Sequence, residues 1–208
     1  MQGKSFLPPR RRSGNAGYTL IELILVLAIA AITWALVMPS LGQWAGDLRL
    51  RLAAQQMASV LRAARGYAVL HNARVAVRLT TDDNGEVFYA LYRDGDGDGV
   101  RTADVRSGAD PEVWAPRPMS FHSGGIRFGF PPGRPPRHPS NPRQRLTRLD
   151  DPIRFNRSDL ASFSPQGTAT PGSLYLTDSQ HRLAAVRVFH RSGKVTVLVY
   201  DQEKDDWI

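Results

Sequence analysis

The sequence predicts an α+β fold, with one long N-terminal helix packed on an antiparallel β-sheet domain. Three observations support this prediction. Residues 18–41 are apolar, residues 50–68 carry apolar residues at helical spacing, and period-two alternation begins at residue 74. Of the 208 residues, 42% are hydrophobic and 22% are charged, so the chain can bury a core of its own.

Charge is distributed unevenly along the chain, whose formal net charge is +8. Residues 1–17 contain four basic and no acidic residues, and residues 131–149 contain five arginines and no acid. The positive charge therefore lies in a leader and in one loop, and the body of the protein is nearly neutral. The absence of cysteine excludes disulfides, thiolate metal sites and cysteine nucleophiles.

The apolar segment has the length and composition of a membrane-spanning helix. Between Leu23 and Met38 the only polar side chain is that of Thr33, and residues 20–41 approach the ~20 residues that span a bilayer. A buried core helix is the alternative, which so long an apolar run disfavours. Basic residues stay cytoplasmic, so Lys4 and Arg10–Arg12 predict that the C-terminal bulk lies across the membrane.

The region before this helix differs from an ordinary secretory signal, whose small-residue cleavage site follows the apolar run. Here Asn15, Ala16 and Gly17 precede it. We therefore expect residues 1–17 to be a leader peptide, residues 18–41 the transmembrane and assembly helix, and residues 42–208 the globular domain.

Glu22 is the unusual residue of the apolar helix, because an ionised carboxylate that enters a bilayer costs a few kcal/mol or more. One interpretation is a carboxylate that stays wet at the headgroup level. The other is that Glu22 has a positive partner. Cleavage after Gly17 would create an α-amino group at Tyr18, about one helical turn from Glu22, and a neighbouring subunit could supply an equivalent group.

Residues 17–39 resemble the processing site and first helix of type IV pilins and type II secretion pseudopilins. In that family, prepilin peptidase cuts after a glycine and N-methylates the exposed residue, usually phenylalanine. The family's glutamate is fifth in the mature chain, and a proline kinks the helix. The resemblance therefore implies cleavage after Gly17, methylation of Tyr18, assembly roles for Glu22 and Pro39, and a type IV pilin-like fold.

Pro39 removes a backbone donor, so we expect it to kink or break the helix, with helix resuming by Asp47 and running to about Leu70. The resumed helix carries an apolar stripe, which we expect to dock on a sheet; a separate partner helix is the alternative. The stripe consists of Leu50, Ala53, Ala54, Met57, Val60, Leu61, Ala64, Tyr67 and Ala68.

The rest of the chain predicts short strands. A β-hairpin is predicted over residues 74–92. Residues alternate between apolar and polar over Arg74–Thr81, residues 82–85 contain an Asn-Gly turn signal, and Val87–Tyr92 is the returning strand. Further strands are expected at residues 125–130, 152–155, 173–177, 183–190 and 194–200, with a tight turn at residues 191–193 between the last two.

The C-terminal part resembles the ending of the GspH/FimT pseudopilin domain. The similar residues are Phe163–Ala169 with its Gly-Thr-Ala sequence, then SLYLT, then VRVFHRSGKVTV around a glycine turn. The resemblance covers residues 17–93 and about 150–200, and residues 94–149 are interpreted as an insertion.

Residues 131–149 contain six prolines and five arginines, so we expect no regular element there. One interpretation is a mobile, solvated loop. The other is an electrostatic contact with phosphate, lipid headgroups or an acidic partner. No aromatic residue lies between the arginines, so a base-stacking platform is not supported.

The run Asp94-Gly-Asp-Gly-Asp-Gly99 matches the start of an EF-hand-type calcium loop. The closing glutamate is absent, because Val105 stands at the twelfth position; Asp104, Asp110 and Glu112 are nearby acids. We expect a weak calcium site, and an ordinary polar hairpin tip is the alternative. The expected ligands are Asp94, Asp96, Asp98, the carbonyl of Val100 and Asp104.

The sequence contains no catalytic constellation, so we expect no enzyme and no required cofactor, with calcium as the optional ion. The resemblance implies a structural minor pseudopilin of a type II secretion pseudopilus. Its partners would be prepilin peptidase, the inner membrane and other pseudopilins, with its domain in the periplasm. The alternative is a minor type IV pilin that assists pilus assembly or DNA uptake and binds DNA through the basic loop. A membrane-anchored hydrolase is the least supported function.

Overall fold

The computed structural model describes residues 17–82, 86–119, 124–155 and 158–208, and within the first of these ranges it gives only the backbone of residues 36–43. The chain divides into two units, residues 1–43 and 44–208. The leader expected at residues 1–17, apart from Gly17, and the Asn-Gly pair of the turn expected at residues 82–85 lie outside the described residues.

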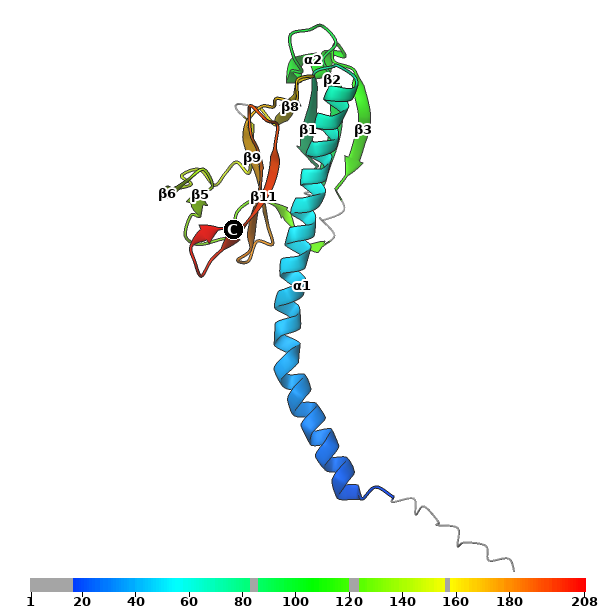
Figure 1. The fold of residues 1–208 in the computed structure, drawn as a ribbon, viewed down its shortest axis with the longest axis vertical. Coiled ribbons are helices and arrows are strands. Elements are labelled where there is room, and N and C mark those ends of the chain that lie inside the picture. The colour runs from blue at the N-terminus through cyan, green and yellow to red at the C-terminus, as the bar shows by residue number, and fades with distance from the viewer. Residues whose placement is uncertain (1–16, 83–85, 120–123, 156–157) are drawn as a thin grey trace, which may run out of the picture. The chain divides into compact units, whose positions relative to one another are not determined.

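Helix α1, Leu20–Leu70, is one continuous helix (Figure 1). It begins after Thr19, whose Oγ1 accepts a hydrogen bond from the backbone N–H of Glu22 at 3.3 Å, as an N-cap does. The turn that follows Leu70 contains Asn72, which has a φ of 47° and lets the N–H of Ala73 reach the carbonyl oxygen of Ala68 at 3.1 Å.

Of the kink or break expected at Pro39, the break is wrong, because α1 remains helical through that residue. A proline inside a helix removes only its own N–H from the hydrogen-bond ladder and clashes with one preceding carbonyl group. The turns on either side keep their own bonds, so the interruption stays local.

The apolar stripe on the second part of α1 packs on sheets, as predicted. Leu50, Ala53, Ala54, Met57, Ala58, Leu61, Ala64 and Ala68 are each no more than 1% exposed. They share one core with buried residues of the two larger sheets described below, and Val60 and Tyr67 pack against this core. The stripe is therefore a sheet-docking face.

The first sheet has the strand order β3-β2-β1-β8 and is antiparallel. Its strands are β1 (Val75–Thr81), β2 (Val87–Arg93), β3 (Glu112–Pro118) and β8 (Leu160–Phe163). The hairpin of β1 and β2 confirms the prediction, while β3 and β8 were not expected. Along β1, Val75, Val77 and Leu79 face the core with α1, and alternation places Ala76, Arg78 and Thr80 on the outer face.

The second sheet has the order β12-β11-β10-β9-β4, with β7 also paired to β9. Its strands are β4 (Arg127–Phe128), β7 (Ile153–Phe155), β9 (Gly172–Thr177), β10 (Leu183–Val188), β11 (Val195–Asp201) and β12 (Asp206–Trp207). All but β12 correspond to predicted segments. One face joins the core beneath α1, and the other face carries a second cluster built on Tyr175, Leu183 and Ala185.

Residues 131–149 form regular structure, which corrects the prediction of none. Strands β5 (Arg137–His138) and β6 (Asn141–Arg145) pair as a two-stranded ribbon beside the second sheet (Figure 1). A two-stranded ribbon has an unpaired outer edge, where the missing N–H of a proline costs no ladder bond. Leu146, which follows β6, is buried in the second cluster, so the segment covers the outer face of the sheet.

Candidate functional site

The N-terminal motif stands at the very start of the described helix. Tyr18 is 86% exposed, and among the described residues beyond its chain neighbours no atom lies within 4 Å of where a Cβ on Gly17 would stand. Glu22 lies in the first turn of α1, where a carboxylate is favoured by the helix dipole. Helix geometry thus holds Glu22 within about one turn of Tyr18.

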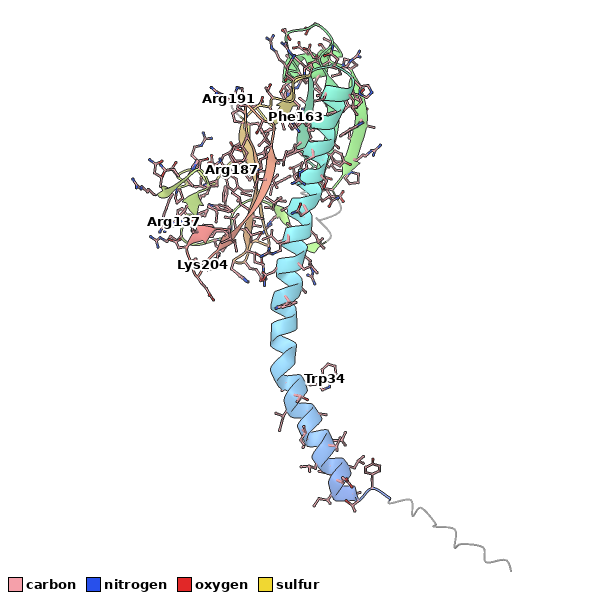
Figure 2. The ribbon with its side chains drawn as sticks, in the orientation of Figure 1. Trp34, Arg137, Phe163, Arg187, Arg191 and Lys204 are labelled. Carbon is pink, nitrogen blue, oxygen red and sulfur yellow. The ribbon has the colours of Figure 1, made fainter. Side chains whose placement is uncertain are left out.

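The side chains of residues 20–35 form an exposed apolar surface. Nine large aliphatic side chains are each 55–78% exposed: Leu20, Ile21, Leu23, Ile24, Leu25, Val26, Leu27, Ile29 and Ile32. Trp34 is 62% exposed and stands out from α1 in Figure 2. Thr33 donates its hydroxyl to the carbonyl oxygens of Ile29 and Ala30, so its polar group is satisfied within the helix. Contiguous apolar surface of this kind marks a protein or membrane contact.

Among the described residues, no helix is both long enough and apolar enough to cross a membrane.

The Asp-rich loop brings three of the predicted calcium ligands together. One carboxylate oxygen from each of Asp94, Asp96 and Asp98 lies within 4.8 Å of the others. Gly97 and Gly99 have φ values of 93° and 95°, a conformation that favours glycine and that curls the loop around these acids.

Asp104, the predicted closing ligand, is not in this group of carboxylates and lies instead in the first turn of α2 (Thr102–Ser107). Asp110 holds the loop from inside: it is 1% exposed and accepts hydrogen bonds from the N–H groups of Gly95 and Arg101. Val100 contributes its side chain to a small buried cluster.

The three acids of the loop differ in their hydrogen bonds, and the pKa values of Asp96 and Asp98 are shifted in opposite directions. Both carboxylate oxygens of Asp94 accept backbone N–H groups, from Gly97 at 2.7 Å and Gly99 at 3.0 Å. The N–H of Asp98 lowers the pKa of Asp96, whereas desolvation and the adjacent Asp96 raise the pKa of Asp98. Arg101 forms an ion pair with Asp98. Arg74 Nη1 also lies 3.9 Å from Asp94 Oδ2, so two arginines already pair with this preformed cluster of three carboxylates.

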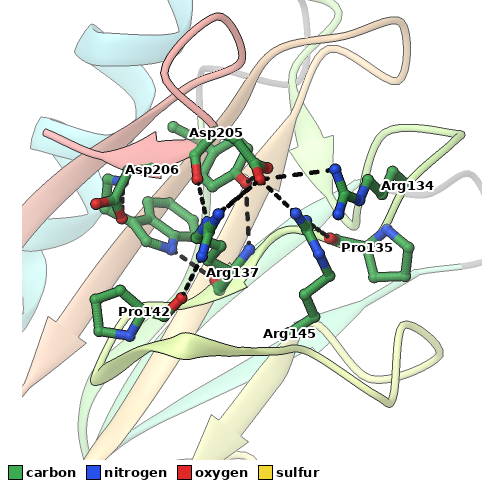
Figure 3. Close-up of polar contacts among 9 residues, drawn as sticks. Arg134, Pro135, Arg137, Pro142, Arg145, Asp205 and Asp206 are labelled. Atoms are coloured by element: carbon green, nitrogen blue, oxygen red, sulfur yellow. Dashed lines mark hydrogen bonds and ion pairs between the residues drawn. The ribbon is translucent and has the colours of Figure 1, made fainter.

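The Pro/Arg-rich segment is held by one carboxylate that sequence reasoning missed. Asp205, in the turn between β11 and β12, pairs with three of the five arginines (Figure 3). Arg145 contacts its Oδ2, Arg137 Nη2 lies 3.1 Å from the same oxygen, and Arg134 Nη1 lies 3.8 Å away. The guanidinium of Arg145 holds the pKa of Asp205 well below its ordinary value.

Further hydrogen bonds fix this cluster of Arg134, Arg137, Arg145 and Asp205, which we call the Asp205 cluster. The Tyr200 hydroxyl donates to Asp205 Oδ1 at 2.6 Å, and Trp207 Nε1 donates to the carbonyl oxygen of Arg137 at 2.7 Å. The solvated loop expected from composition is therefore a ribbon tied to the C-terminal hairpin. The acidic residues of the C-terminal sequence DQEKDDWI are the feature of the sequence that could have indicated a partner for these arginines.

Two further arginines lie under the ribbon and have carbonyl partners. Arg187 donates to the carbonyl oxygen of Pro139 at 2.8 Å and to Ser140 Oγ at 2.5 Å. Arg154 lies 5.4 Å from the ring centroid of Phe130 and 5.3 Å from that of Tyr175. Arg187 therefore fastens the ribbon to the sheet, whereas Arg154 packs on two rings of the second cluster and donates to the carbonyl oxygen of Asp151 at 2.7 Å.

The Gly-Thr-Ala sequence forms a junction between α1 and the last hairpin. Gly167 has a φ of 76°, and its carbonyl oxygen accepts a hydrogen bond from Arg65 Nε at 3.1 Å. The N–H of Ala169 donates to the carbonyl oxygen of His190 at 2.9 Å, and Ser164 Oγ lies 2.7 Å from Thr168 Oγ1. This motif therefore has a structural role.

Comparison with known families matches both regions that carry the motifs. A family model described as type II transport protein GspH matches residues 53–150, and one described as prokaryotic N-terminal methylation motif matches residues 12–36. The chain belongs to the GspH/FimT-like pseudopilins. The structure of this pseudopilin agrees with that family, because an N-terminal helix precedes an antiparallel sheet domain.

The matched range of this pseudopilin differs from the range of the sequence resemblance. It runs through residues 94–149, which were interpreted as an insertion, and ends before the C-terminal strands. No curated protein and no solved structure matches the chain.

Proposed function

We propose that this pseudopilin is a minor subunit of a type II secretion pseudopilus. It is made as an inner-membrane precursor with a cytoplasmic N-terminus and a periplasmic domain, cleaved by prepilin peptidase after Gly17 and methylated at Tyr18. The observation that supports this most strongly is the methylation motif at the start of α1, whose helix continues into the domain core. Its role is structural, as in GspH-family pseudopilins, and it is a substrate of an enzyme rather than an enzyme.

The exposed apolar surface of residues 20–35 suits the helix first to the membrane and then to the filament. Burying a large aliphatic side chain contributes roughly 1.5–3 kcal/mol, so nine such residues in water are strongly unfavourable. A bilayer satisfies this surface in the precursor, and the helices of neighbouring subunits satisfy it in the filament. The same segment therefore serves as anchor and as assembly surface.

Glu22 supplies the polar element of that assembly surface. Its carboxylate pairs with the amino group of Tyr18, most usefully that of a neighbouring subunit. In a poorly hydrated site, loss of one member of a charge pair costs ~3–5 kcal/mol. The pair would therefore fix the axial position of the helix relative to the helices of neighbouring subunits.

Incorporation into filaments tests this function directly. Pseudopili sheared from cells that produce the wild-type chain should contain it in processed form. Gly17→Val places a branched side chain at the cleavage position, and this variant should stay in the membrane as precursor and be absent from filaments. Ala16→Val is the matched control and should be processed. Absence of the wild-type chain from the filaments, or processing of Gly17→Val, would overturn the proposal.

DNA binding through the basic segment is the alternative function. The sequence supports it more than the structure does, because Asp205 faces three of the five arginines. Of the other two, Arg148 Nε lies 3.7 Å from Asp150 Oδ1 in an exposed pair, and Arg143 has no carboxylate partner among the described residues. Salt-dependent DNA binding that is lost in Arg143→Gln with Arg148→Gln would favour this alternative. Binding that is unchanged in this double variant would exclude the segment as the DNA site.

A further inference from the structure

The outer face of the first sheet, opposite α1, carries a polar groove outside the sites described above. The groove has a volume of about 430 Å³. Its floor is β1, with Arg78 and Thr80; α2 forms one wall with Thr102 and Arg106; and Asp159 and Leu160 lie on the other side. The ribbon, the Asp205 cluster and the Asp-rich loop contribute no residue to it.

The pairing register of β1 with its two neighbouring strands explains why Arg78 lines this groove. It pairs across the sheet with Ala90 of β2 and Leu160 of β8, so small or aliphatic neighbours flank it on both sides. Helix α2 covers only one part of the outer face, where Val105 packs with Ala76 and Leu160. Arg78 therefore emerges at the open end of the face, beside the last turn of α2, which carries Arg106.

The guanidinium groups of Arg78 and Arg106 are not engaged by the described part of the chain. Among the described residues, neither guanidinium makes a hydrogen bond or a salt bridge, and Asp159 is the one carboxylate that lines the groove. Burial and the nearby Asp151 raise the pKa of Asp159, which only the longer-range attraction of Arg78 lowers. The groove thus combines two cations, one weakly compensating acid and the hydroxyl groups of Thr80 and Thr102.

These groups fit a carboxylate better than other anionic partners. A guanidinium binds a carboxylate with two parallel hydrogen bonds, and threonine hydroxyls can donate to its remaining lone pairs. Nucleic acid is disfavoured, because among the described residues that line the groove there is no aromatic ring to stack a base. A lipid headgroup is disfavoured, because the lining contains no exposed large apolar side chain.

We propose that the groove between β1 and α2 receives an aspartate or glutamate side chain of a neighbouring subunit, held by Arg78 and Arg106. This inference rests on the proposed function, since it requires a second subunit in the filament. It adds a contact between globular domains to the contact made by the apolar part of α1. The domain contact would be specific for subunits that carry an acid at the matching height.

Paired arginine substitutions in the full-length chain test the proposal. Arg78→Gln with Arg106→Gln should lower the amount that co-purifies with the other pseudopilins by about tenfold, as expected for two partly exposed ion pairs. Arg93→Gln with Arg117→Gln removes the same charge from exposed positions of the same sheet and should have no effect. Both double variants should melt at the wild-type temperature or above it.

The outcomes separate the groove from the function on which it rests. Equal loss in both double variants, or loss in neither, overturns the groove proposal while the wild-type chain still enters filaments. Absence of the wild-type chain from filaments instead overturns the proposed function. If millimolar inorganic phosphate stabilises the wild-type chain but not Arg78→Gln with Arg106→Gln, and co-purification is unchanged, the groove binds a free anion and the proposal is wrong.

A cross-link identifies the occupant. The chain has no cysteine, so Thr80→Cys creates a unique thiol within the groove for a benzophenone label. Irradiation of assembled filaments should link this label to a pseudopilin peptide that contains aspartate or glutamate. A label at Ser59→Cys, on the exposed face of α1, should not reach that peptide. Cross-linking of the Thr80 label to lipid or nucleic acid alone would contradict the proposal.

Discussion

A Cβ on Gly193 would lie 2.3 Å from the carbonyl oxygen of Gly167, so these two glycines touch backbone to backbone. The contact joins the turn of the last hairpin to the Gly-Thr-Ala turn, and Arg65 of α1 lies against both. The Gly-Thr-Ala turn is thus the point where α1, β8 and the β10–β11 turn meet.

Gly193→Ala should destabilise the domain by about 2 kcal/mol or more, because a side chain is strained at a φ of 56° and would also overlap Gly167. Thermal melting of the full chain in detergent measures this. Ser192→Ala, one residue earlier in the same turn, is the control and should melt as the wild type does. An unchanged melting temperature for Gly193→Ala would mean that the turns do not meet as described.

Leu61→Asp should be among the most destabilising single changes in the protein. Leu61 is fully buried between α1 and the sheets, and an unpaired carboxylate there has no partner. The expected loss is more than about 4 kcal/mol. Gln55→Asp, on the exposed side of the same helix, should leave the melting temperature nearly unchanged. Similar melting of the two variants would refute the packing of this helix on the sheets.

Sequence periodicity predicted the parts of the fold in which one face of an element is buried. The stripe from Leu50 to Ala68 and the alternation of Val75, Val77 and Leu79 are local patterns, and both faces were assigned correctly. The break expected at Pro39 was wrong because it was inferred from the proline alone. The intact helical turns on either side of Pro39 keep the helix continuous.

The missed features depend on partners that are distant in sequence. Strand β6 contains Pro142 and reads as loop, yet Arg137 and Arg145 are fixed by Asp205, 68 and 60 residues away. Strand β8 is only four residues long and exists because it pairs with β1. For the Asp-rich loop, local spacing correctly grouped three acids, whereas the role of Asp110 inside the loop required the tertiary structure.

Asp205→Asn should destabilise the domain at neutral pH by removing the counter-ion of the Asp205 cluster. The folded-state pKa of Asp205 is depressed, so its contribution is complete above the unfolded value of about 4 and is lost as the pH falls below it. The melting temperatures of the wild type and the variant should therefore converge as the pH is lowered from about 4. A difference that stays constant through this range would exclude ionised Asp205 as the source.

Calcium binding at the Asp-rich loop remains a prediction. A weak extracytoplasmic site should bind at ~10⁻⁴–10⁻³ M, and titration calorimetry on the full chain should detect heat that is absent from Asp96→Ala with Asp98→Ala. Arg101→Gln frees Asp98 from its ion pair and should tighten binding. If millimolar calcium produces neither heat nor stabilisation, the loop is an ordinary acidic hairpin tip.

Glu22→Ala should impair filament incorporation while leaving membrane insertion intact, because the change removes a charge from an apolar helix. Glu22→Asp keeps the charge and should retain part of the incorporation. Quantification of both variants in sheared filaments and in membranes measures the two steps separately. Normal incorporation of Glu22→Ala would contradict the proposed charge pair.

The mass of the intact protein extracted from membranes tests the account most directly. The account predicts a chain that begins at Tyr18 and carries one additional methyl group on its α-amino nitrogen, with residues 18–208 otherwise unmodified. A mature chain that begins after the apolar segment, beyond residue 41, would contradict the account, because cleavage there would remove the helix on which membrane anchoring and assembly both depend.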